Sequence, residues 1–157
     1  MNTREKQKLK MKLLTDEEAL KVGESLFVSL GDKRVADLIC GGLECGSYAT
    51  FGVDTAKYVK PEVVWSAGDS WPVEQPFRHV QYPLSEGGAA TLFCRYDEEE
   101  GEEEREFKLD LPTLKKGLAR FVVGYPHLFA EVLKDNEDAL VSDAYLQCCL
   151  LGEVVYG

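Results

Sequence analysis

The sequence predicts an α+β fold: an antiparallel β-meander of about four to five strands, with N- and C-terminal helices packed on one face. Apolar residues recur at helical spacing near both ends of the chain, whereas short alternating runs bounded by turn residues fill the middle. The length of 157 residues favours one domain. We expect a basic flexible arm at residues 1–12 and a single α+β domain at residues 13–157.

The first predicted helix begins after Thr15. Thr15 and Glu18 have the spacing of a capping box, and Gly31 is suited to end the helix in a left-handed conformation. A second, weaker helix is expected over residues 34–45. Two adjacent glycines interrupt its apolar stripe, so a turn or close backbone packing is an equally good interpretation there.

Five short segments are predicted to form strands. They share β-branched or aromatic residues and are separated by Gly, Pro, Asp or Ser. In chain order they are residues 48–53, 62–66, 77–82, 90–96 and 107–111. Because the connections are short, consecutive strands are expected to pair in an antiparallel manner.

The last third of the chain is predicted to be helical. A helix capped by Asp110 should end near Gly124, and a short helix should follow over residues 127–135. The final helix is expected at about residues 137–151, with Asn136 as its cap. Its apolar residues lie on more than one face, which predicts a central position in the core.

Acidic charge is concentrated in one stretch of the sequence. The chain has a net charge of −10, and residues 97–106 supply −7 of it through eight carboxylates and Arg105. The first twelve residues supply +4, and the body is mildly acidic. Binding of nucleic acid through the body is therefore not expected, because phosphate contacts need clustered Lys and Arg.

The acidic stretch is predicted to be the tip of a hairpin between residues 90–96 and 107–111. It has three interpretations: a solvated turn that protects the sheet edge, a contact for a basic protein surface, or a mimic of DNA phosphates. It lacks the alternating Asp/Asn spacing of a calcium loop. The candidate binding residues are Asp97, Glu98, Glu99, Glu100, Glu102, Glu103 and Glu104, together with Trp65 and Trp71.

Trp65 precedes a predicted loop at residues 67–76 that is rich in Gly, Asp, Ser and Pro, and Trp71 lies within it, with Phe77 and Tyr82 nearby in the sequence. Aromatic residues in a loop can form a ligand pocket or a hot spot for a protein partner. Alternatively, they cover the open end of a sheet. The sequence leaves both interpretations open.

Cysteine usage favours a reducing cytoplasm. The count of five is odd and two cysteines are adjacent, which does not fit a secreted disulfide framework. No apolar run approaches the roughly 18 residues of a membrane span, and no signal peptide is evident. The cysteines lack the usual zinc-site spacing, and His79 and His127 belong to no catalytic motif. We therefore expect buried structural thiols, no metal, no cofactor and no catalytic residues.

The C-terminal residues 114–157 resemble the C-terminal part of small uncharacterised phage and prophage proteins. The resemblance rests on Lys116-Gly117-Leu118, Tyr125-Pro126-His127, Asp138-Ala139, Asp143, Leu146-Gln147 and the closing residues 152–157. It implies an origin in a mobile element and carries no known site.

These observations predict an accessory protein of phage type that binds another protein with a basic surface and catalyses no reaction. The alternatives are an acidic DNA mimic that inhibits a nucleic-acid-binding enzyme, a structural subunit that forms a homo-oligomer through its final helix, and a small enzyme.

Overall fold

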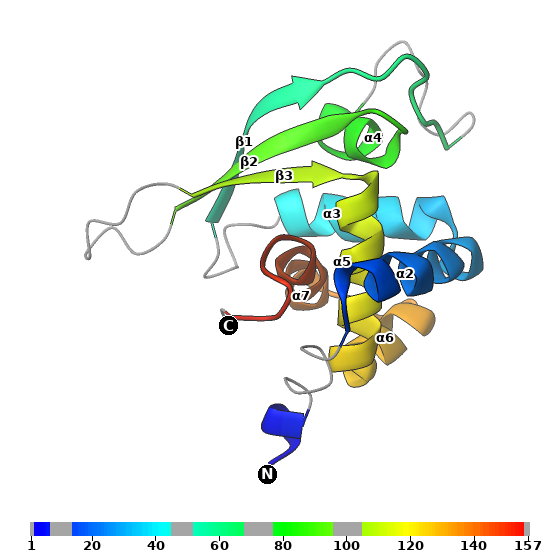
Figure 1. Cartoon of the computed structure of the whole chain (residues 1–157), viewed down its shortest axis with the longest axis vertical. Helices are drawn as coiled ribbons and strands as arrows, with labels where there is room; N and C mark the ends of the chain where they lie inside the picture. Colours follow the sequence, from blue (N-terminus) through cyan, green and yellow to red (C-terminus); the bar gives the residue numbers. More distant parts are fainter. Residues whose placement is uncertain (1, 7–13, 45–51, 68–76, 96–104, 156–157) are drawn as a thin grey trace.

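The computed structural model describes residues 2–6, 14–44, 52–67, 77–95 and 105–155. In this part of the chain the fold is mostly helical, with one three-stranded antiparallel sheet in the order β1-β2-β3. The sheet lies on one side of the molecule with α4 beside it, and the remaining labelled helices gather below it (Figure 1). The predicted meander of four to five strands is therefore wrong.

The elements follow one another in this order: α2 (Asp16–Leu30), α3 (Asp32–Glu44), β1 (Gly52–Val59), α4 (Arg78–Leu84), β2 (Ala89–Arg95), β3 (Arg105–Asp110), α5 (Leu111–Gly124), α6 (Pro126–Leu133) and α7 (Ala139–Leu151). Residues 3–6 form one further helical turn.

Two of the five predicted strands are not strands. Residues 62–66 are irregular, and most of the predicted strand at residues 77–82 belongs to α4. Aromatic and β-branched residues suggested a strand there, but burial against the core decides the conformation. The fully buried Gln81 donates from its side-chain Nε2 to the carbonyl oxygen of Trp65 (2.9 Å) and accepts from the backbone N–H of Phe77 through Oε1. These bonds stabilise the helical turn where the sequence predicted a strand.

The other strand predictions fall close to the observed sheet. β2 and β3 include all but the last residue of the segments predicted at residues 90–96 and 107–111, and they pair from Ala89↔Asp110 to Cys94↔Arg105. The first strand, β1, is described over Gly52–Val59, and most of the segment predicted at residues 48–53 falls in residues 45–51, outside the described part. It pairs with β2 in an antiparallel manner, with a register shift between Thr55 and Lys57.

Most of the predicted helix ends are confirmed. The hydroxyl of Thr15 accepts a hydrogen bond from the backbone N–H of Glu18 (3.2 Å), and Gly31 ends α2 with a positive φ of 92°. Asp110 caps α5 as predicted, accepting from the N–H of Thr113 (3.0 Å). The prediction of Asn136 as the cap of the final helix is wrong, because Asp138 caps α7.

The core lies where α5 packs against α2 and α7, while α3 packs against α7. α7 is buried along most of its length, as its apolar faces predicted. The hydroxyl of Tyr145 in α7 donates to the carbonyl oxygen of Leu114 in α5 (2.8 Å), which satisfies both polar groups inside the core. The glycine pair of α3 stays helical, and a Cβ on Gly41 or Gly42 would lie 2.6 or 3.0 Å from Ser142 of α7. Close helix packing therefore accounts for the two glycines.

Among the described residues, none of the helices has the length and apolar character that crossing a membrane requires.

Candidate functional site

The first candidate site is the acidic segment between β2 and β3. The two strands are neighbours in the sheet, and the last paired residues at this end are Cys94 and Arg105. The seven candidate acidic residues fall within residues 96–104, outside the described part of the chain. What the structure fixes is the position of the two ends, which are held side by side by the ladder at one end of the sheet.

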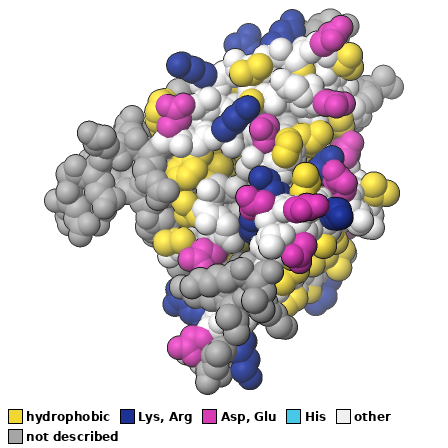
Figure 2. Space-filling model, in the orientation of Figure 1, with side chains coloured by type: hydrophobic (Ala, Val, Ile, Leu, Met, Phe, Trp, Pro, Cys, Tyr) yellow, Lys and Arg dark blue, Asp and Glu magenta, His cyan; other side chains and the backbone are white. Residues whose placement is uncertain are grey.

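Charge distinguishes this segment from the described surface. Residues 96–104 contain seven carboxylates and neither Lys nor Arg, whereas the chain as a whole has 28 acidic and 18 basic residues. On the face shown in Figure 2, Lys and Arg side chains alternate with Asp and Glu side chains across the described residues. The strong single-sign charge of the segment is therefore not continued over this face.

Trp65 lies at the periphery of the hydrophobic core. Its side chain is half-buried and packs against the core. The indole Nε1 donates to Asp32 at the start of α3 (3.2 Å), and its backbone N–H donates to the hydroxyl of Ser85 (2.6 Å). These bonds join the irregular segment around Trp65 to α3 and to the end of α4. Trp71, the other aromatic candidate, lies outside the described residues.

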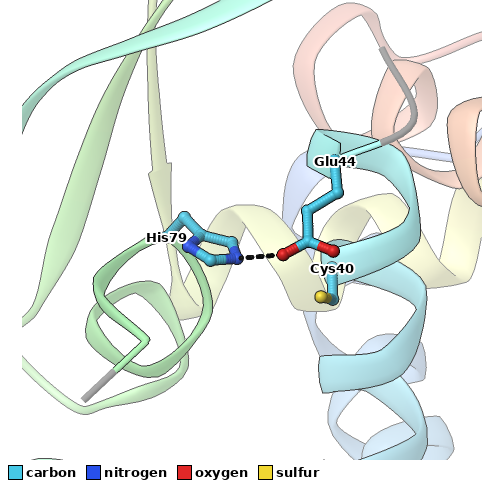
Figure 3. Close-up of side chains that lie close together, drawn as sticks. All are labelled: Cys40, Glu44 and His79. Carbon is cyan, nitrogen blue, oxygen red and sulfur yellow. Dashed lines mark ion pairs between the residues drawn. The ribbon is translucent and has the colours of Figure 1, made fainter. Parts of the chain in front are cut away.

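A second candidate site is a cluster of three side chains from two helices. Cys40 and Glu44 lie one turn apart on α3, and His79 is the second residue of α4. The cysteine sulfur, a carboxylate oxygen and a ring nitrogen of these residues all lie within 4.8 Å of one another. In Figure 3 the Glu44 carboxylate points across the gap between the helices toward the ring of His79, and Cys40 lies on the same side of α3. These are three atom types that commonly bind transition metals.

The ring of His79 has two described neighbours, the carboxylate of Glu44 and the ring of Phe77. Its Nε2 lies 3.4 Å from Oε1 of Glu44, and the ring of Phe77 packs edge-on with a centroid distance of 6.1 Å. The Nε2 atom is buried and makes no hydrogen bond to any described residue. Glu44 is the exposed member of the cluster, with 60% of its side chain accessible, so the cluster opens to solvent on that side.

The other cysteine side chains that the structure describes belong to the core. Cys148 and Cys149 are buried in α7, and burial raises the pKa of the Cys149 thiol to about 12. Burial also raises the pKa of Cys148 well above its ordinary value. Such thiols stay protonated and are poor ligands and nucleophiles at neutral pH. Among the cysteine side chains that the structure describes, Cys40 is the one that lies beside a histidine and a carboxylate.

The sequence predicts a buried structural thiol at Cys40 and places His79 in no catalytic motif. One local signal was present: Cys40 and Glu44 have the i,i+4 spacing that places two side chains on one face of a helix. His79 could not be added from the sequence, because its segment was predicted as a strand and its approach to α3 is a tertiary contact.

Two surface hollows of about 450 Å³ each also occur in the described part. One lies between α2, the turn at residues 86–88 and the start of α5, and charges of both signs line it. The other contains the ion pair between Asp16 and Arg120, which lowers the pKa of Asp16. Neither hollow contains a histidine, and no catalytic arrangement of described residues lines them.

Comparisons with protein-family models, with curated proteins and with solved structures find no match to this chain.

Proposed function

We propose that the protein acts by binding a partner protein with a basic surface, and that the acidic segment at residues 96–104 is the contact. The single observation that carries this proposal is the placement of seven carboxylates between two paired strands. Opposite charges across an interface steer the encounter and determine which partner fits. The resemblance of the C-terminal third to phage and prophage proteins supports an accessory role in the cytoplasm of a bacterial host.

The position of the segment supports recognition. The ladder between β2 and β3 fixes the residues on either side of the segment next to each other, and nine residues connect them. Like charges confined to so short a connection repel one another, and a cationic partner relieves that repulsion. Trp65 is not a contact residue in this proposal. Its hydrogen bonds to Asp32 and Ser85 stabilise the fold.

The competing function is that of a protein that mimics duplex DNA. DNA presents charge at regular spacing along its length. The face in Figure 2 shows both signs interspersed, which supports a local contact rather than a mimic that covers a whole face. The two functions differ in one measurable respect: a mimic loses its partner when duplex DNA is added.

The test compares three chains as baits in a bacterial lysate at low and at physiological salt. They are the unchanged chain, a segment variant and a body variant. The segment variant carries Gln at Glu98, Glu99, Glu100, Glu102 and Glu103. The body variant loses the same charge at Glu17, Glu24, Glu62, Glu86 and Glu131, whose side chains lie at the surface outside the basic arm and the segment.

We expect the unchanged chain and the body variant to retain the same basic protein, and the segment variant to lose it. Circular dichroism should show that all three chains are folded. Equal retention by the segment variant would remove the acidic segment from the function. Release of the partner by duplex DNA would instead favour the mimic.

A further inference from the structure

We propose that Cys40, Glu44 and His79 form a binding site for a zinc ion between α3 and α4. The site is independent of the acidic segment, and it adds an activity that the partner-binding function does not require. The described residues supply three ligands: a thiolate sulfur, a carboxylate oxygen and a ring nitrogen. Three protein ligands leave one of the four tetrahedral positions for water or another donor.

The distance between Glu44 and His79 fits shared metal coordination better than a hydrogen bond. The separation of Oε1 and Nε2 is 3.4 Å. A charged N–H···O hydrogen bond is about 2.7–2.9 Å long, whereas two ligand atoms at about 2.0–2.1 Å from a tetrahedral ion are about 3.4 Å apart. The buried Nε2 that lacks a hydrogen bond to any described residue would then have an ion as its partner.

The sulfur is also within reach. All three ligand atoms lie within 4.8 Å of one another, and a tetrahedral zinc site needs a sulfur-to-nitrogen separation of about 3.6 Å. Zinc binding therefore requires the Cys40 sulfur to move closer to the His79 ring, and Cys40 projects on the same side of α3 as Glu44 (Figure 3). Cys40 and Glu44 already occupy one face of one helix, so both can approach the same ion.

The ligand types select the metal. Mg²⁺ and Ca²⁺ prefer sites made of oxygen atoms, so a sulfur and an imidazole ligand disfavour both. Zinc accepts sulfur, nitrogen and oxygen ligands together, and Co²⁺ occupies the same geometry. Because the ligands come from two helices, the ion would cross-link α3 to α4 and stabilise the folded chain.

The test uses the full chain after metal removal under reducing conditions, and it measures binding of Co²⁺ alone and of Zn²⁺ alone. Absorption reports the thiolate-to-cobalt charge transfer, and calorimetry gives affinity and stoichiometry. The variants are Cys40→Ser, Glu44→Gln and His79→Gln. His127→Gln is the matched control, because His127 is the other histidine of the chain and is exposed.

We expect one ion per chain, a charge-transfer band that Cys40→Ser abolishes, and a rise in melting temperature with zinc. Glu44→Gln and His79→Gln should each weaken binding by more than about tenfold, since even partners beyond the ligands contribute 10–100-fold. His127→Gln should bind as the unchanged chain does. Glu44→Gln is the decisive variant, because a largely exposed side chain can be changed without unfolding the protein. Absence of binding, or equal binding by Glu44→Gln and the unchanged chain, would overturn the site.

Discussion

Arg34 on α3 joins the helix to the segment that connects α6 and α7. Its guanidinium donates to the carbonyl oxygen of Val132 (2.8 Å) and lies 2.6 Å from Glu137 and 3.1 Å from Asp135. The hydrogen bond from Arg34 lowers the pKa of Glu137, against the opposing effect of burial. A single side chain therefore holds together helices that are about a hundred residues apart in sequence.

Replacing Arg34 with Met should lower the free energy of unfolding by about 1.5–3 kcal/mol, because charge-assisted hydrogen bonds are lost and the half-buried Glu137 loses its partner. Urea unfolding measures the loss. Lys33→Met is the matched control, since Lys33 is 61% exposed and its carboxylate neighbour lies 3.7 Å away. Equal losses in the two variants would contradict the role of Arg34.

The same pair predicts a dependence on pH. A carboxylate with a lowered pKa stabilises the fold above its unfolded value of 4.5, and the contribution disappears as the pH falls through the lower, folded value. The difference in stability between the unchanged chain and Arg34→Met should therefore shrink in acid. This can be followed by repeating the urea titrations from pH 7 downward.

Asp143 presents the opposite case. It is 7% exposed, it accepts a hydrogen bond from the side chain of Gln147 (2.7 Å), and its other oxygen has no partner among the described residues. Burial raises its pKa, so its ionised form destabilises the fold as the pH rises through the folded value.

Replacing Asp143 with Asn should therefore raise the free energy of unfolding at pH 7, and the gain should shrink as the pH falls toward 3.8. Thermal unfolding across this pH range measures the effect. Exposed Glu62→Gln removes the same charge and should give no such gain. A gain independent of pH would show that the charge of Asp143 is not the cause.

At the scale of elements, the contact between α2 and α5 depends on Gly23. A Cβ built on Gly23 would lie 2.0 Å from the carbonyl oxygen of Lys115, which is closer than any two such atoms can approach. The backbones of the two helices therefore touch at this point, and no flexible side chain lies between them to give way.

Gly23→Ala should destabilise the protein by about 1–3 kcal/mol or more, because the helices must separate to admit the methyl group. Ser25→Ala on the same helix is the control; Ser25 is exposed, so the change should stay within about 0.5 kcal/mol. Chemical denaturation of both variants provides the comparison. An unchanged stability for Gly23→Ala would show that the α2–α5 contact is looser than described.

The elements that were predicted correctly have local causes. The capping bonds of Thr15 and Asp110 and the alternation in β2 and β3 are encoded within a few residues. α4 was missed because its conformation depends on Gln81, whose side chain reaches Trp65 sixteen residues earlier. The cluster of Cys40, Glu44 and His79 was not predicted for the same reason. His79 was expected in a strand, and nothing in the sequence indicated that this segment packs against the helix that carries Cys40 and Glu44.

At the scale of the whole molecule, most of the net negative charge lies in one short segment, and the rest of the chain is close to balanced. Residues 97–106 contribute −7 of the net −10, and the described surface in Figure 2 is mixed in sign. The sequence alone located this concentration and predicted the strands on either side of it. Which interpretation of the segment applies depends on a partner surface, and that information is not contained in one chain.

The most direct test of partner binding is the dissociation constant of the captured partner. It is measured at increasing salt concentration for the unchanged chain and for the segment variant. Five lost charges at about 0.2–1 kcal/mol each should weaken binding by about fivefold or more at low salt. The segment variant should also show a shallower dependence on salt, because fewer charges remain to be screened. Equal affinity and equal salt dependence in the two chains would contradict the proposed function.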